Sequence, residues 1–169
     1  MATETYIPLA TVTLAASSSA VYFTEISQDY SDLVLVVEQT GASGNTSIQV
    51  QFNGDSGTNY SNVYMGGNGS TASSSSNTGY PRIQVGGFIE YADGTAKQLA
   101  ICEINDYSAT DKHKTVLTRS NVATGAGSGL SAWAGRWANT SAVTSIALVN
   151  QNYAAGSTFK LFGIHGEVV

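Results

Sequence analysis

The sequence predicts an all-β protein, a single two-sheet antiparallel sandwich over residues 1–169 for which the jelly roll is the favoured variant. Short runs of β-branched and aromatic residues recur between clusters of Gly, Asn, Asp and Ser, as strands and turns require. No segment shows helical periodicity over a length sufficient to predict a helix. A chain of 169 residues has the size of one domain and can bury about 70% of its unfolded surface without disulfides or a metal.

The expected strands follow from this pattern. Within residues 47–52, three apolar residues alternate with two glutamines, which is typical of a half-buried strand. Leu33–Val37 has no alternation, which predicts a central strand covered on both faces. In chain order, the expected strands are Tyr6–Leu14, Val21–Phe23, Asp32–Gln39, Ser47–Phe52, Tyr60–Met65, Arg82–Tyr91, Lys97–Asn105, Lys114–Ser120, Leu130–Trp137, Val143–Asn150 and Thr158–Val168.

The segments between these strands carry strong turn chemistry. Asn53–Gly57 and Ala92–Thr95 supply the residues that adopt positive φ in tight hairpins. Gly66–Gly79 and Val122–Gly129 are rich in Gly and Ser, and we expect both to be long surface loops.

Charge is sparse and unevenly placed. No Lys or Arg precedes Arg82, so the first half would repel phosphate, and a nucleic-acid partner is disfavoured. The longest aliphatic run, Leu33–Val37, is far shorter than the ~20 residues that a membrane helix needs. The first residues lack a basic, signal-like region, so we expect synthesis in the cytoplasm and no membrane partner. The acidic residues of the first half are Glu4, Glu25, Asp29, Asp32, Glu38 and Asp55.

No local motif predicts catalysis or a cofactor. The single cysteine, Cys102, and the two histidines, His113 and His165, have no metal-ligand spacing. No G-x-S-x-G nucleophile elbow or phosphate-binding glycine motif occurs. Residues 53–57 resemble the start of a calcium loop but lack its bidentate Glu, so a hairpin turn is preferred. A glycan-cleaving site would need paired carboxylates, for which the available residues are Glu90, Asp93, Glu103 and Asp106.

Two tryptophans are the most informative aromatic pair. In a strand over residues 130–137, Trp133 and Trp137 share one face, and Arg136 lies on the other. They could form a stacking platform for a sugar or an interface with a partner subunit, together with Tyr64 and Tyr80. The alternative, ordinary packing of the indoles in the core, is favoured for any strand tryptophan.

Three groups of segments, in this order and spacing, resemble a family of tailed-bacteriophage virion structural proteins. They span most of the chain, and their turn and strand patterns carry no catalytic residue. The first group is Tyr6–Ala10, Val21–Ile26 and Tyr30–Leu35; the second is Phe52–Ser61 and Gly67–Ser70; the third is Ser145–Leu148 and Ala155–Ile164.

The resemblance implies a non-enzymatic structural role in the virion. Members of this family include β-sandwich decoration (cement) proteins of capsids and domains of tail fibres. The short chain favours a decoration protein that binds the major capsid protein on the outer capsid surface as a homotrimer and stabilises the shell. The alternative is a tail-fibre or baseplate domain that works with other tail components and recognises glycans of the host surface.

Overall fold

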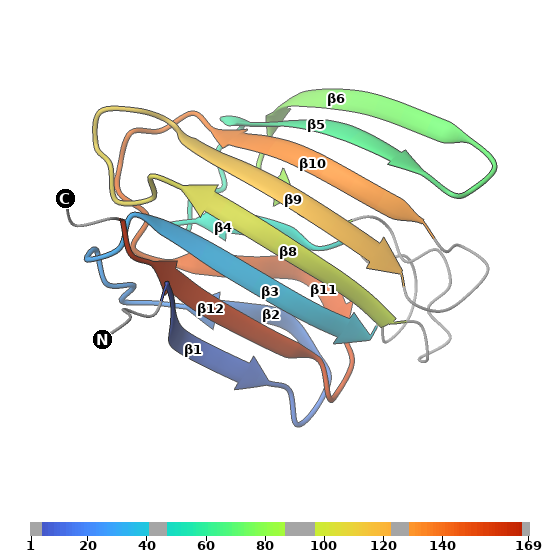
Figure 1. The fold of residues 1–169 in the computed structure, drawn as a ribbon, viewed down its shortest axis with the longest axis horizontal. Helices are drawn as coiled ribbons and strands as arrows, with labels where there is room; N and C mark the ends of the chain where they lie inside the picture. Colours follow the sequence, from blue (N-terminus) through green and yellow to red (C-terminus); the bar gives the residue numbers. More distant parts are fainter. Residues whose placement is uncertain (1–4, 41–46, 87–96, 123–128, 167–169) are drawn as a thin grey trace.

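The computed structural model describes residues 5–40, 47–86, 97–122 and 129–166, and these residues form two packed antiparallel sheets (Figure 1). The described segments contain strands, turns and bends but no helix. The two-sheet antiparallel sandwich predicted from the sequence is therefore confirmed. None of the described segments forms a helix that is long and apolar enough to span a membrane.

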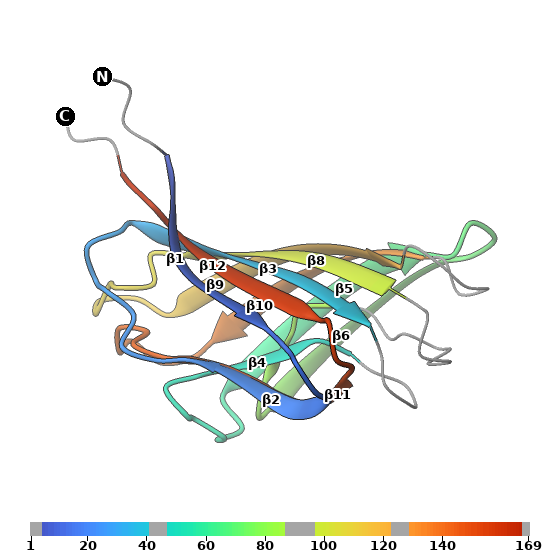
Figure 2. The same cartoon turned by 90° about the horizontal axis from the view of Figure 1, so that it is seen from below.

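Over the described residues, the larger sheet has eight strands and the smaller has four. The order in the large sheet is β1-β12-β3-β8-β9-β10-β5-β6, and the order in the small sheet is β2-β11-β4-β7. Figure 2 shows the small sheet as a second layer against one face of the large sheet. The strand bounds are β1 Tyr6–Thr13, β2 Ser18–Phe23, β3 Asp32–Thr40, β4 Gln49–Phe52, β5 Tyr60–Gly67, β6 Ala72–Tyr80, β7 Ile83–Gln84, β8 Lys97–Asn105, β9 Lys114–Val122, β10 Leu130–Trp137, β11 Ile146–Tyr153 and β12 Thr158–Ile164.

The core lies between the two sheets because one alternating set of side chains on each strand faces inward. In β3, Leu33, Leu35 and Val37 are fully buried, and they meet Val50 and Phe52 of β4 within one hydrophobic cluster. Asp32, Val34, Val36, Glu38 and Thr40 alternate with them and point to the opposite side of the large sheet. We call that side the outer face.

Most of the expected strands agree with the observed ones to within a few residues. Lys97–Asn105 and Leu130–Trp137 match β8 and β10 at both ends. The segment Arg82–Tyr91 contains only the short strand β7 among its described residues, and residues 87–91 lie outside them. The expected turn Ala92–Thr95 also lies outside the described residues.

The prediction of a loop over Gly66–Gly79 is wrong. Residues 66–67 end β5, and residues 72–79 belong to β6, which pairs with β5 across the whole segment. The turn between them is held by Asn68, whose Oδ1 accepts hydrogen bonds from the backbone N–H groups of Ser70 (3.0 Å) and Thr71 (2.8 Å). Serine has little intrinsic strand preference, so the pairing with β5 decides the conformation.

Three further expectations need correction. Asn53 and Gly54 have positive φ as predicted, but the turn leads from β4 in the small sheet to β5 in the large one, so it is not a hairpin. Val122 ends β9 and does not begin a loop, while residues 123–128 lie outside the described residues. The strand containing Leu33–Val37 is central, but the second sheet packs on its inner side, and on the outer face Val34 is buried whereas Val36 is only partly buried.

Candidate interaction surface

The two tryptophans lie on the inner face of β10, where they are packed and not displayed. Trp137 is 1% exposed and Trp133 is 6% exposed. The ring of Trp137 stacks at 6.2 Å on Tyr60 and meets Phe52 edge-on at 5.6 Å between ring centroids. The shared face predicted for the pair is confirmed, and the packing interpretation describes both indoles, because both are buried on that face.

The remaining predicted site residues do not gather at one place. Tyr64 lies on the same inner face as Trp133, with ring centroids 4.6 Å apart, and its hydroxyl accepts a hydrogen bond from Ser73 Oγ at 3.3 Å. Tyr80 is exposed at the end of β6, and Arg136 is exposed on the outer face. The structure thus joins Tyr64 to Trp133 and separates Arg136 from both.

Asp55 links the turn that follows β4 to Trp137 through a hydrogen bond. One carboxylate oxygen, Oδ2, accepts hydrogen bonds from Trp137 Nε1 (2.7 Å) and Asn59 Nδ2 (2.8 Å), while Oδ1 accepts one from the Gly57 N–H (2.8 Å). The hydrogen bond from Asn59, followed by those from Trp137 and Gly57, holds the pKa of Asp55 below its usual value against the opposing effect of burial. The carboxylate that we considered as a calcium ligand therefore stabilises the segment that connects β4 in the small sheet to β5 in the large one.

The groups that could perform chemistry are dispersed over the described residues. Cys102 is fully buried, and its burial raises the pKa of the thiol to about 12. Glu103 lies 3.9 Å from Arg119, and Asp106 lies 3.1 Å from Lys112, all of them exposed pairs. Glu90 and Asp93 fall outside the described residues. Within the ranges described, no group of three His, Cys, Asp or Glu side chains could hold a metal ion.

A broad apolar area covers the outer face of the large sheet. Its large hydrophobic residues come from five strands and have 38% to 67% of their surface exposed; they are Tyr6, Val63, Met65, Leu99, Leu117 and Leu130. Strand register aligns two of them, Leu117 and Val63, in one row that runs Phe162, Val34, Glu103, Leu117, Ala134 and Val63. Tyr6 packs edge-on against Phe162 at 6.5 Å, which extends the area to β1 at the sheet edge.

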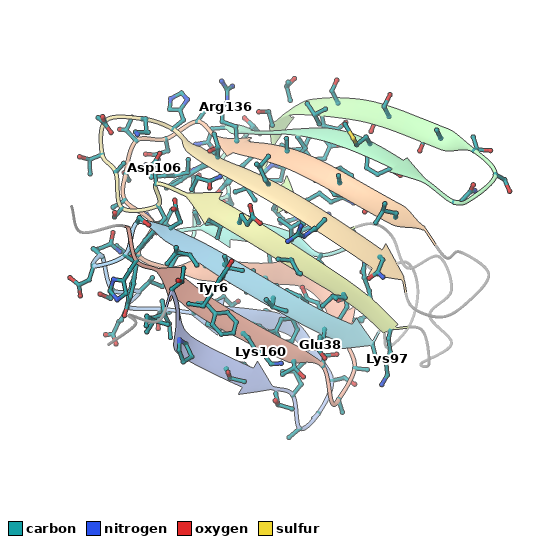
Figure 3. The ribbon with its side chains drawn as sticks, viewed as in Figure 1. Tyr6, Glu38, Lys97, Asp106, Arg136 and Lys160 are labelled. Atoms are coloured by element: carbon teal, nitrogen blue, oxygen red, sulfur yellow. The ribbon has the colours of Figure 1, made fainter. Side chains whose placement is uncertain are left out.

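The charges on this face nearly cancel. Figure 3 shows Glu38 and Lys160 near one end of the face, where they form an ion pair of 3.3 Å. Four cations against three acids leave the face a net charge of +1, whereas the whole chain has −5. The cations are Lys97, Arg119, Arg136 and Lys160, and the acids are Asp32, Glu38 and Glu103.

The face is large enough for a stable interface. Strands lie about 4.8 Å apart and rise about 3.3 Å per residue, so eight strands of about eight residues cover about 1,000 Å². A standard protein interface buries about 800 Å² on each partner. Several large apolar side chains exposed on one face are typical of interaction sites.

Our sequence reasoning missed the six apolar residues of this face, although a signal was present. In Lys97–Asn105, the residues that face the core, Ala100, Cys102 and Ile104, alternate with a second apolar pair, Leu99 and Ile101. A strand that is apolar on both sides either lies between two layers or has one side that can bind another protein. Only the tertiary structure shows that a single layer covers it.

No protein-family model, curated protein or solved structure matches this chain.

Proposed function

We propose that this chain is a structural protein of a bacteriophage particle, most specifically a capsid decoration (cement) protein that binds the outer surface of the shell and stabilises it. The observation that carries this proposal is the outer face of the large sheet, which combines exposed apolar side chains with balanced charge over about 1,000 Å². Such a face suits a protein that binds another protein surface. The family resemblance of the sequence supplies the virion as the setting.

The strand connectivity supports the jelly-roll variant of the sandwich. Strands β1, β3, β8 and β12 pair in the large sheet in the same relative order as β2, β4, β7 and β11 in the small one. Among these eight strands, successive ones alternate between the layers except β4 and β7, which pair with each other in the small sheet. This strand order is what two nested Greek keys of eight strands require. The pairs β5-β6 and β9-β10 are then insertions that widen the large sheet and extend its outer face.

The proposed mechanism places the outer face against the major capsid protein, with trimers at local three-fold positions bridging neighbouring shell subunits. One contact repeated three times in each trimer multiplies a modest affinity. The shell is thereby held against internal pressure without any chemical step.

The test is binding of the purified protein to capsids prepared without it, compared between two variants. Leu117→Lys introduces a charge at the centre of the outer face, where Glu103 lies opposite and can pair with it in the unbound chain. Tyr22→Lys makes the same change at an equally exposed apolar residue on the small sheet, 63% against 52% exposed.

We expect wild type and Tyr22→Lys to bind capsids with the same affinity. Leu117→Lys should bind at least about tenfold more weakly, because removing water from its ammonium group at the interface costs more than ~1.4 kcal/mol. Equal binding of both variants contradicts the use of this face. Failure of the wild-type protein to bind any capsid contradicts the decoration role.

The second candidate is a receptor-binding domain of a tail fibre or baseplate. It is favoured by the half-buried Tyr64, whose ring contacts Trp133 at a tilt and whose hydroxyl lies beside that of Ser73, a combination of aromatic and polar groups that suits a sugar ring. Retention of the purified protein on host cells and not on capsids would select this function.

A further inference from the structure

Within the described residues, the two sheets have four edge strands, and these differ in whether further strands can pair with them. The large sheet ends at β1 and β6, and the small sheet ends at β2 and β7. The outward backbone N–H and C=O groups of an edge strand can pair with a strand of another chain unless something blocks them. Charged residues, proline, bulges and shortness are the usual obstacles.

Three of the four edges carry an obstacle. In β1, Pro8 has no N–H to donate, and the register shifts between Pro8 and Ala10. In β2, the Ser18 hydroxyl donates to the Ala20 carbonyl (2.8 Å) and accepts from the Ala20 N–H (3.3 Å), which occupies backbone groups of that strand. Strand β7 has only two residues.

Strand β6 carries none of these obstacles along most of its length. It has nine residues, all exposed except the partly buried Asn77, and none is charged or proline. Its pairing with β5 is regular from Ala72 to Thr78, and the one shift in register falls at the end, near Gly79. Figure 1 shows β6 at the rim of the large sheet, opposite the rim formed by β1. This edge is therefore open to a further strand.

We propose that β6 pairs antiparallel with β6 of a second copy of this chain across a two-fold axis, so that two large sheets join edge to edge. The other three edges are obstructed. Of the four edge strands in a second copy, its β6 is therefore the one best able to pair with β6 of the first. Two copies bring no like charges into contact there, although each chain carries a net charge of −5. A two-fold contact uses the same strand twice and closes on itself.

The composition of β6 suits self-pairing. Ser73, Ser74, Ser75 and Ser76 stand in sequence, so antiparallel alignment about the middle of the strand places serine opposite serine in several registers. Hydroxyl side chains facing each other across two strands form hydrogen bonds that add to those of the backbone. Their small size also lets the strands approach without rearrangement.

This contact leaves the outer face available. Both copies contribute to one continuous sheet. Their outer faces therefore lie on the same side and together form a face of twice the area. The two-fold contact is separate from the three-fold contact of the proposed trimer, and its failure would not affect the proposal that the outer face binds the shell. Where both contacts occur, they link trimers into a net, as a layer over a shell requires.

The first test compares assembly mass by sedimentation over a range of concentrations. In Ser74→Lys/Ser76→Lys, two exposed outer-face positions of β6 gain charges that would meet their own copies across the axis. The matched control, Thr11→Lys/Thr13→Lys, places the same charges on exposed positions of β1. We expect the β6 variant to have a lower assembly mass than wild type and the β1 control, and half of it where the two-fold contact acts without the three-fold one.

A second test identifies the strand at the contact. Single cysteines are introduced at positions 73 to 77 and treated with a short bis-maleimide, while Cys102 is fully buried and its thiol is protected. We expect at least one of these cysteines to link two copies, and a cysteine replacing Thr11 in β1 not to do so. The proposal is overturned if wild type already has the mass of the β6 lysine variant, as it would if β6 pairs only with a different protein, or if no position on β6 cross-links.

Discussion

The two faces of the large sheet are made by the same strands, but one is buried and the other is exposed. In β8, Ala100, Cys102 and Ile104 on the inner face are fully buried, whereas Leu99 on the outer face is 38% exposed. The inner set packs against the small sheet within one hydrophobic cluster. The outer set has no described layer over it. Apolar residues on a strand therefore stabilise this fold on one side and offer a binding surface on the other.

The largest expected difference is between leucines on the two faces. We expect Leu35→Ala, on the inner face, to lower the free energy of unfolding by about 2–5 kcal/mol, because it removes fully buried methyl groups and leaves a cavity. Leu117→Ala, on the outer face, should change it by less than about 0.5 kcal/mol, because its side chain is already 52% exposed. Denaturant unfolding of both variants measures this. Similar losses for the two would mean that the outer face is covered in the isolated chain.

A smaller difference is expected between neighbouring small residues of β10. A Cβ at Gly135 would lie 2.4 Å from Ile83 Cγ2, so Gly135→Ala should force rearrangement of the core at a cost of about 1–3 kcal/mol. Ala134 is exposed on the outer face, and Ala134→Ser should leave stability nearly unchanged. Thermal unfolding compares the two. An unaltered melting temperature for Gly135→Ala would contradict the close packing of β7 on β10.

An effect of similar size is expected for the hydrogen bonds of Asp55 at the end of the inner face. Because the folded pKa of Asp55 is lowered, its contribution to stability is fully present above its unfolded pKa and is lost as pH falls through the folded value. Asp55→Ala should cost about 1–3 kcal/mol at neutral pH through the lost hydrogen bonds to Trp137, Asn59 and Gly57.

The measurement is a series of denaturant curves from neutral pH to below about pH 4, near the ordinary value of a carboxyl group. The difference between wild type and Asp55→Ala should shrink in the acid range. A difference that stays constant down to the lowest pH would show that the carboxylate form of Asp55 does not matter.

Much of the architecture could be predicted from local patterns. Turn residues and strand-length apolar runs located most strands, because both signals act within a few residues. Strand β6 was missed for the opposite reason: its serines have no strand signal of their own, and the strand forms because β5 lies beside it. The tryptophan pair shows the same limit, since a shared face follows from alternation, but burial depends on which strands lie across from it.

The sequence by itself determined the all-β class, the polar and charge-poor surface, and the positive-φ corner at Asn53 and Gly54, because these depend on residue type and on short-range backbone geometry. Only the tertiary structure decided which face of the large sheet became the core and which edges stayed open. Both outcomes depend on contacts between segments far apart in the chain. No local pattern contains the position of the second sheet, and so the exposed outer face and the unobstructed β6 edge emerge only in three dimensions.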